Sequence, residues 1–145
     1  MIAYEDINKK LPELLDQLLQ QEKHPIATLT KAKIETVLDS KLPVAGVYLI
    51  SEGEGDIPVY VGRSRTLAQR IGTDHRATQR TQATLAYKLT TLNIPGITCM
   101  ISARQYMYQN YKVRILPIED VYTRTIFEVY ASMKLETKHN SFLEH

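Results

Sequence analysis

The chain has 145 residues and a mass of 16.6 kDa, and 43% of its residues are hydrophobic and 23% charged, so it can fold around one core without disulfides. This composition excludes collagen, disordered and coiled-coil chains, and no apolar run approaches the roughly 20 residues of a membrane-spanning helix. Charge is unevenly distributed: residues 1–62 hold six basic and ten acidic residues, whereas residues 63–145 hold twelve and six.

The N-terminal residues and the cysteine content indicate the compartment. Glu5 and Asp6 stand where a secretory signal would be basic and then apolar. The single cysteine cannot form an internal disulfide. We therefore expect a soluble cytoplasmic protein that makes no contact with a membrane.

Residues 1–43 predict a helical N-terminal arm. Pro12 fits the first turn of its first helix, and Pro25 ends that unit. A second short helix is expected from a Thr30 cap to Ser40, before Pro43. This acidic arm is expected to pack on the rest of the chain, to self-associate or to contact a partner protein. The first helix is indicated by leucines at helical spacing: Leu11, Leu14, Leu15, Leu18 and Leu19.

A β-hairpin is predicted next, with strands over 45–50 and 58–62 and a glycine-containing turn over 51–56. Ser64 can cap a following short helix with Leu67 on its apolar side. A longer helix is predicted over 77–92.

The last third of the chain predicts strands over 97–101 and 111–116, whereas 102–110 gives no clear pattern. A helix is expected from an Asp120 cap to about Lys138. Residues 143–145 resemble the beginning of a purification tag. The order of elements predicts an α+β domain with a small antiparallel sheet and flanking helices. The last helix should be covered on two faces, because Phe127, Ala131 and Leu135 lie opposite an apolar stripe of Tyr122, Ile126, Val129, Tyr130 and Met133.

Basic residues concentrate after the hairpin. Six of them, faced by the single acid Asp74, predict a surface that attracts polyanions, nucleic acid first. The alternative is a solvated basic face with no partner. The six are Arg63, Arg65, Arg70, Arg76, Arg80 and Lys88.

Two tripeptides on the predicted strands carry the most specific signal. Gly46-Val47-Tyr48 and Tyr60-Val61-Gly62 follow one another at short separation, and Arg70, His75, Glu128 and Asn140 come after them. This set resembles the GIY-YIG nuclease family over residues 44–142. The resemblance implies a three-stranded antiparallel sheet with surrounding helices, and a metal-dependent DNA endonuclease domain that follows the arm.

The resemblance also implies a role for each residue. Glu128 would hold Mg²⁺ or Mn²⁺ as the single acidic ligand. Arg70 would offer a planar fork to the scissile phosphate, and Asn140 would brace the site. Tyr48 is the candidate general base and Tyr60 would position water or phosphate, although the reverse assignment stays open. His75 would bind phosphate, assist a tyrosine or lie on the surface. Duplex or branched DNA would contact Arg63, Arg65, Arg76 and Arg80.

Structural readings compete with these roles. Without the resemblance, Tyr48 and Tyr60 would simply pack their rings on a sheet. Glu128 could pair with Arg124 one turn earlier, and Asn140 could cap a helix. Two functional alternatives remain: a catalytically lapsed nucleic-acid-binding module of the same fold, and a protein-binding adaptor built on the arm. Residues expected to have no catalytic role are His24 and His139 on the surface and Cys99, which is expected to be a buried hydrophobic residue in an apolar strand.

Overall fold

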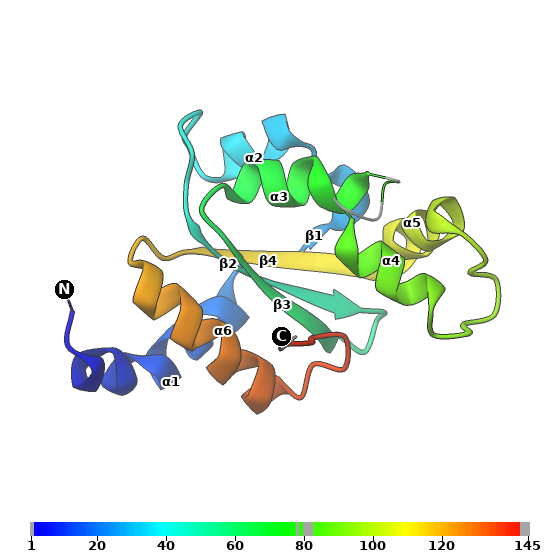
Figure 1. Cartoon of the computed structure of the whole chain (residues 1–145). Helices are drawn as coiled ribbons and strands as arrows, with labels where there is room; N and C mark the ends of the chain where they lie inside the picture. Colours follow the sequence, from blue (N-terminus) through cyan, green and yellow to red (C-terminus); the bar gives the residue numbers. More distant parts are fainter. Residues whose placement is uncertain (1, 78, 80–82, 143–145) are drawn as a thin grey trace.

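The computed structural model describes residues 2–77, 79 and 83–142. These residues form an α+β architecture with a four-stranded antiparallel sheet and six α-helices (Figure 1). The strands are β1 (His24–Pro25), β2 (Gly46–Glu52), β3 (Ile57–Ser64) and β4 (Tyr111–Pro117). The α-helices are α1 (Tyr4–Gln20), α2 (Lys31–Val37), α3 (Leu67–Gly72), α4 (Thr84–Thr90), α5 (Met100–Asn110) and α6 (Val121–Leu135). Two short 3₁₀ helices are η1 (Ile26–Thr28) and η2 (Asp74–Arg76).

The strand order is β1-β4-β2-β3, so the expectation of three strands was wrong by one. The additional strand, β1, comes from the N-terminal arm and pairs with Lys112 and Val113 of β4. A strand of two residues is too short to show the alternation from which strands are predicted. Among the helices that the structure describes, none is long and apolar enough to cross a bilayer.

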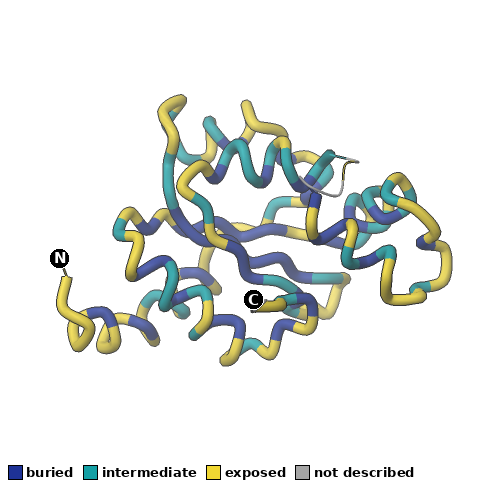
Figure 2. The backbone as a smooth tube through the Cα atoms, in the orientation of Figure 1, coloured by how far each residue is buried: buried dark blue, intermediate teal, exposed yellow. Residues whose placement is uncertain are grey.

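Helices cover both faces of the sheet (Figure 1). Side chains of β2 alternate between the two faces: Tyr48 and Ile50 join the core under α2, α3, α4 and α5, whereas Val47 and Leu49 join the core under α1 and α6. Figure 2 shows the strands as the most deeply buried part of the chain. The hairpin β2–β3 is therefore held from both sides, and β3 lies at one edge of the sheet.

Several predicted elements are confirmed, including the hairpin, α1, α2 and α6. Two of the three predicted caps, Thr30 and Asp120, form as well. The Thr30 hydroxyl accepts a hydrogen bond from Lys33 N at 3.2 Å, and Asp120 Oδ2 accepts from Thr123 N at 2.8 Å. Local capping chemistry thus fixed these two helix starts.

Other boundaries differ from the prediction. Helix α1 begins at Tyr4, so Pro12 lies inside the helix rather than in its first turn. Ser64 ends β3 instead of capping a helix, and its hydroxyl accepts from Thr66 N at 2.9 Å. Of the helix predicted over 77–92, only Thr84–Thr90 is α-helical in the described part.

The strand predicted over 97–101 was wrong. Cys99 is the N-cap of α5, and Ser102 Oγ accepts from Cys99 N at 3.0 Å, so an apolar run is interrupted by a helix start. The side chain of Cys99 is exposed, which corrects the expectation that it is buried.

Helix α6 contacts the core with the side opposite its apolar stripe and with only part of the stripe itself. Tyr122 and Met133 are exposed, whereas Arg124 is buried. The Arg124 guanidinium donates to the carbonyls of Ile118 and Glu119 at 3.2 and 2.5 Å. Backbone carbonyls thus compensate the burial of this charge. Phe127 and Ala131, opposite the stripe, are buried in the core, and Ile126 and Tyr130 of the stripe are partly buried against the same core.

Candidate active site

A buried tyrosine and a buried histidine form the inner part of the candidate site. The Tyr48 hydroxyl lies 2.6 Å from Nε2 of His75 in η2, and both side chains are withdrawn from solvent. Burial raises the pKa of Tyr48 well above its usual value; Tyr60 adds to this effect and Arg70 opposes it. Burial lowers the pKa of His75 to about 3, with the charge of Arg70 as a second cause. At neutral pH both groups are therefore uncharged.

Arg70 of α3 joins this pair to the second tyrosine. Burial acts to lower the pKa of Arg70, but the neighbouring phenols of Tyr48 and Tyr60 raise it, and their effect prevails. Its guanidinium also donates to the Thr84 hydroxyl at 2.9 Å, and Asp74 Oδ2 lies 3.9 Å from it. One cation thus lies beside both hydroxyl groups.

The two tyrosines differ in their access to solvent. Their ring centroids lie 6.1 Å apart, and both rings project from the same face of the hairpin because Tyr48 pairs with Gly62 and Ile50 pairs with Tyr60. Tyr48 is fully buried, whereas Tyr60 is half-buried and lines a cleft. A molecule in the cleft therefore reaches Tyr60 first.

Gly62 makes room for the Tyr48 ring. A Cβ atom at position 62 would overlap Cζ and the hydroxyl oxygen of Tyr48. The glycine of the second tripeptide is thus required by the tyrosine of the first, since any side chain there would displace the phenol from His75.

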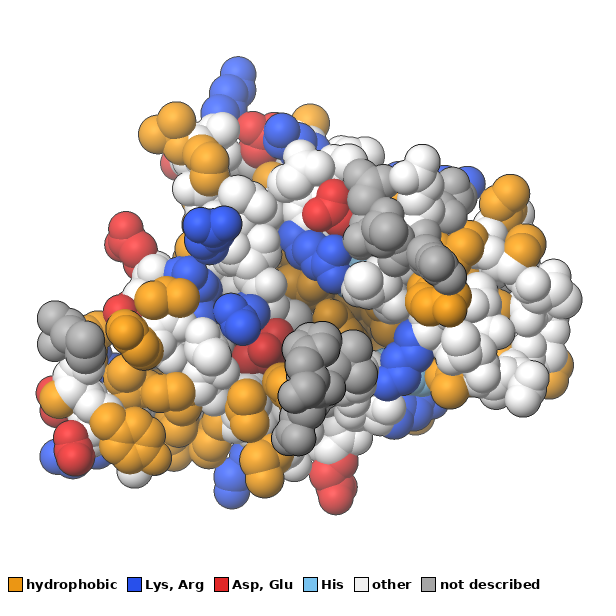
Figure 3. Space-filling model, viewed as in Figure 1, with side chains coloured by type: hydrophobic (Ala, Val, Ile, Leu, Met, Phe, Trp, Pro, Cys, Tyr) orange, Lys and Arg blue, Asp and Glu red, His pale blue; other side chains and the backbone are white. Residues whose placement is uncertain are grey.

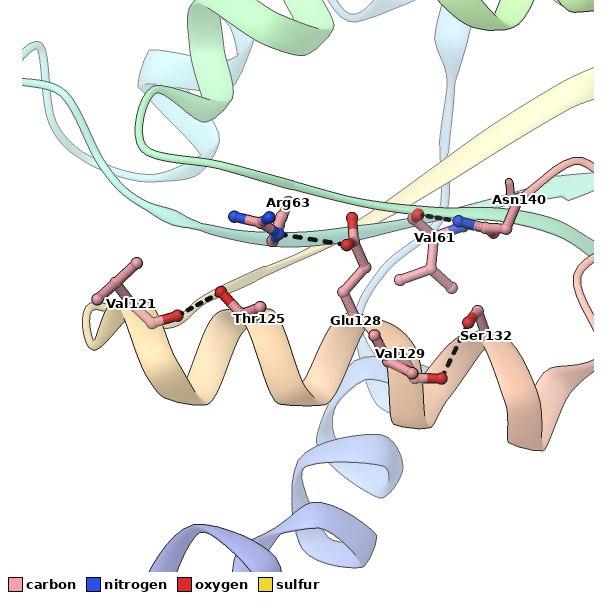
Figure 4. Close-up of polar contacts among 8 residues, drawn as sticks. All are labelled: Val61, Arg63, Val121, Thr125, Glu128, Val129, Ser132 and Asn140. Carbon is pink, nitrogen blue, oxygen red and sulfur yellow. Dashed lines mark hydrogen bonds and ion pairs between the residues drawn. The ribbon is translucent and has the colours of Figure 1, made fainter. Parts of the chain in front are cut away.

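Glu128 approaches the same region from α6. Its Oε1 accepts from Arg63 Nε of β3 at 3.2 Å (Figure 4). Burial raises the pKa of Glu128, and Arg63 acts in the opposite direction. The alternative pairing of Glu128 with Arg124 was wrong, because the guanidinium of Arg124 is bonded to backbone carbonyls.

Asn140 is bonded to the outer edge of β3. Its Oδ1 accepts from Val61 N at 2.8 Å and its Nδ2 donates to Val61 O at 2.7 Å (Figure 4). The Thr137 hydroxyl donates to the same Oδ1 at 2.6 Å. Helix α6 ends before Asn140, so the reading of Asn140 as a helix cap was wrong. The side chain instead completes the hydrogen bonds of the strand residue that follows Tyr60.

A cleft of about 810 Å³ runs along the edge strand β3 and collects residues from β3, α4, α6 and the C-terminal segment. Three predicted catalytic residues line it, whereas Tyr48, Arg70 and His75 lie behind Tyr60. The lining consists of Tyr60, Arg63, Thr84, Leu85, Tyr87, Lys88, Thr91, Glu128, His139, Asn140, Ser141 and Phe142.

Glu128 is the one acidic side chain among these lining residues. Across the part of the chain that the structure describes, no group of three or more His, Cys, Asp and Glu side chains could hold a metal. A divalent cation here would depend on this carboxylate and on oxygens from water or a substrate, which fits the hard-cation chemistry of Mg²⁺ or Mn²⁺.

The four arginines predicted to bind DNA differ in their surroundings. Arg63 and Arg65 are exposed. Arg76 is half-buried, donates to the carbonyls of Ile26 and Ala27, and lies over an aromatic ring, so its guanidinium already serves the fold. Arg80 lies outside the described residues. Figure 3 shows basic side chains across the middle of this face, between α6 and the helices α3 and α4.

The C-terminal segment contributes residues that sequence reasoning missed. His139, expected on the surface, is 5% exposed, and its backbone N–H donates to Val59 O at 3.0 Å. Lys88 of α4 donates to His139 O at 2.9 Å and lines the cleft. Burial lowers the pKa of His139 to about 4, followed by the charges of Lys138 and Lys88. Nothing local marks His139 as buried, because its contacts are with strands and helices distant in sequence.

Comparison of the chain with models of protein families, with curated proteins and with solved structures finds no match.

Substitution of Gly62 by alanine tests the close packing of Tyr48. Gly62→Ala should lower the free energy of unfolding by about 1–3 kcal/mol, because the added methyl group overlaps the buried phenol. Gly55→Ala is the matched control, since a Cβ there meets only Ile57, at 3.7 Å or more. Urea denaturation of both variants measures the difference, and equal stabilities would contradict the packing argument.

The buried histidines predict a loss of stability in acid. His75 and His139 have pKa values of about 3 and about 4 when folded, below the usual 6.5, so unfolding takes up protons and stability falls as the pH drops from about 6.5 to about 4. Each group contributes roughly 1.4 kcal/mol per pH unit within this window. Urea midpoints at several pH values should show a shallower slope for His139→Gln than for the unmodified protein. An unchanged slope for His139→Gln would argue against its burial as a neutral group.

Proposed function

We propose that this chain is a metal-dependent DNA endonuclease of the GIY-YIG type, with a single active site in the cleft along β3. The observation that carries the proposal is that Tyr60, Glu128 and Asn140 line one cleft, with Tyr48 and Arg70 directly behind Tyr60. These side chains come from the hairpin, α3, α6 and the C-terminal segment. A hairpin that only packed two aromatic rings would have no need for a buried cation beside both hydroxyl groups.

The fold supports the same assignment. Strands β4, β2 and β3 agree with the three-stranded antiparallel core that the resemblance implies, with β1 as an addition from the arm. The two tripeptides face each other across the hairpin, since Tyr48 pairs with Gly62. Arg70 and Glu128 lie on helices that approach β3 from the two sides of the sheet.

Access to the cleft favours Tyr60 as the residue that contacts the attacking water. Tyr48 is enclosed by protein, so it does not contact the water. It contributes from behind Tyr60, through its interaction with Arg70 and its hydrogen bond to His75. Arg70 stabilises negative charge on the neighbouring phenols. Its side chain is 22% exposed, so a phosphate oxygen that reaches past Tyr60 meets a rigid donor. In this arrangement the hydroxyl oxygen of Tyr60 takes a proton from the attacking water, and the phenolic proton passes to solvent.

Hydrolysis then joins the water oxygen to phosphorus and breaks the bond from phosphorus to the 3′ oxygen. The products carry a 5′ phosphate and a 3′ hydroxyl, and the leaving oxygen takes a proton from solvent. A divalent cation held by Glu128 would supply positive charge that stabilises the negative charge on the phosphorane and on the leaving oxygen. Asn140 keeps the β3 backbone, and with it Tyr60, in place.

The substrate is proposed to be DNA, duplex or branched, because the cleft is bordered by basic side chains. Arg63 and Lys88 line it, and Arg65 is exposed two residues beyond Arg63. Such residues neutralise backbone phosphates without reading sequence. Among the described residues, no separate helix or strand is available to read bases in a DNA groove. We therefore propose that the protein selects its substrate by DNA structure or through a partner.

Cleavage assays test this function. Duplex, branched and single-stranded DNA should be incubated with Mg²⁺ or Mn²⁺ and, in parallel, with EDTA. We expect nicking only with metal, and Glu128→Gln should abolish it while DNA binding in EDTA is retained. Robust cleavage by Glu128→Gln would remove Glu128 from the metal site, and binding without cleavage by the unmodified protein would favour the non-catalytic module.

The two tyrosines are separated by paired phenylalanine substitutions. Tyr60→Phe should lower the cleavage rate by about 10²–10⁴, the usual contribution of a general base, with little change in stability. Tyr48→Phe leaves His75 Nε2 without its partner, so it should also cost about 1–3 kcal/mol of stability. Tyr122→Phe on the exposed side of α6 is the control. Full activity of Tyr60→Phe would transfer the role to Tyr48, and a protein–DNA adduct on denaturing gels would indicate covalent chemistry instead.

A further inference from the structure

Arg63 and Glu128 form an ion pair inside the cleft, and their side chains differ in exposure to solvent. Arg63 Nε lies 3.2 Å from Glu128 Oε1. The Glu128 side chain is 15% exposed, whereas that of Arg63 is 44% exposed. The carboxylate is therefore the fixed partner, and the arginine is the one that can leave.

This pairing competes with the role proposed for Glu128. A guanidinium at 3.2 Å uses one carboxylate oxygen and places a positive charge next to it. A divalent cation on the same carboxylate would be repelled by that charge. Glu128 is the one acidic residue in the described lining of the cleft, so the cation has no other carboxylate to use there.

Arg63 also has an alternative partner when DNA is present. It follows Gly62 on the edge strand and lines the cleft in which the phosphate would lie. A guanidinium binds phosphate with two parallel hydrogen bonds, so a DNA backbone can replace the carboxylate.

Resting on the proposed nuclease function, we propose that Arg63 is an exchangeable counter-ion of Glu128: it pairs with the carboxylate in the free protein and moves to a DNA phosphate on binding, which opens Glu128 to a divalent cation. Metal and DNA then bind with positive coupling, and each raises the affinity for the other by the same factor. The free protein holds metal weakly, and the cation site is completed only on DNA.

The binding of Mn²⁺, followed by electron paramagnetic resonance without DNA, tests the exchange. Arg63→Gln should bind Mn²⁺ about tenfold more tightly or better than the unmodified protein, because the competing charge is gone. Lys41→Gln, which removes an equal charge from an exposed loop, should bind like the unmodified protein. Glu128→Gln should bind no Mn²⁺ in the cleft.

A second measurement adds a nuclease-resistant phosphorothioate duplex. The duplex should raise the Mn²⁺ affinity of the unmodified protein by a larger factor than that of Arg63→Gln. If Glu128→Gln weakens Mn²⁺ binding but Arg63→Gln neither strengthens it nor reduces the coupling, the exchange is overturned while the metal site stands. If Glu128→Gln binds like the unmodified protein, or if no variant binds Mn²⁺ with or without the duplex, the metal role of Glu128 falls and the exchange falls with it.

Discussion

The packing of the Tyr48 ring against Gly62 is the contact on which the rest of the candidate site depends. It allows a large phenol to lie over the neighbouring strand, fully buried, with its hydroxyl directed at His75. The hydrogen bond to His75 fixes η2, and Arg70 just before η2 is thereby held beside both tyrosines. A side chain at position 62 would disturb all these positions at once, because protein interiors leave little space for adjustment.

The hairpin, the capped helices and the motif residues could be predicted from the sequence because their signals are local. Thr30 and Asp120 each accept a hydrogen bond from a backbone N–H three residues ahead, and such signals survive any tertiary context. The grouping of Tyr48, Tyr60, Arg70, Glu128 and Asn140 was expected from the family resemblance. Spacing alone would not have placed Glu128 and Arg70 on opposite sides of β3.

The sequence predictions that were wrong have physical causes that lie outside any local pattern. The apolar run over 97–101 is interrupted by the start of α5, where the Ser102 side chain accepts a hydrogen bond from Cys99 N. The run by itself is equally compatible with a strand. Only part of the stripe on α6 contacts the core: Ile126 and Tyr130 pack against it, whereas Tyr122 and Met133 face solvent. Arg124, in contrast, is buried. The carbonyls of Ile118 and Glu119 accept hydrogen bonds from Arg124 and so compensate its burial. A hydrophobicity pattern does not reveal such hydrogen bonds from a side chain to the backbone.

The position of the C-terminal segment along β3 has a consequence for association between molecules. β3 is an edge strand, and an open edge with free N–H and C=O groups is a template for pairing with another chain. Asn140 occupies the N–H and C=O of Val61, and the backbone N–H of His139 occupies the C=O of Val59, in the middle of this edge. The amide that aligns the strand beside Tyr60 therefore also protects the protein against edge-to-edge aggregation, so loss of this one side chain would impair solubility and the cleft together.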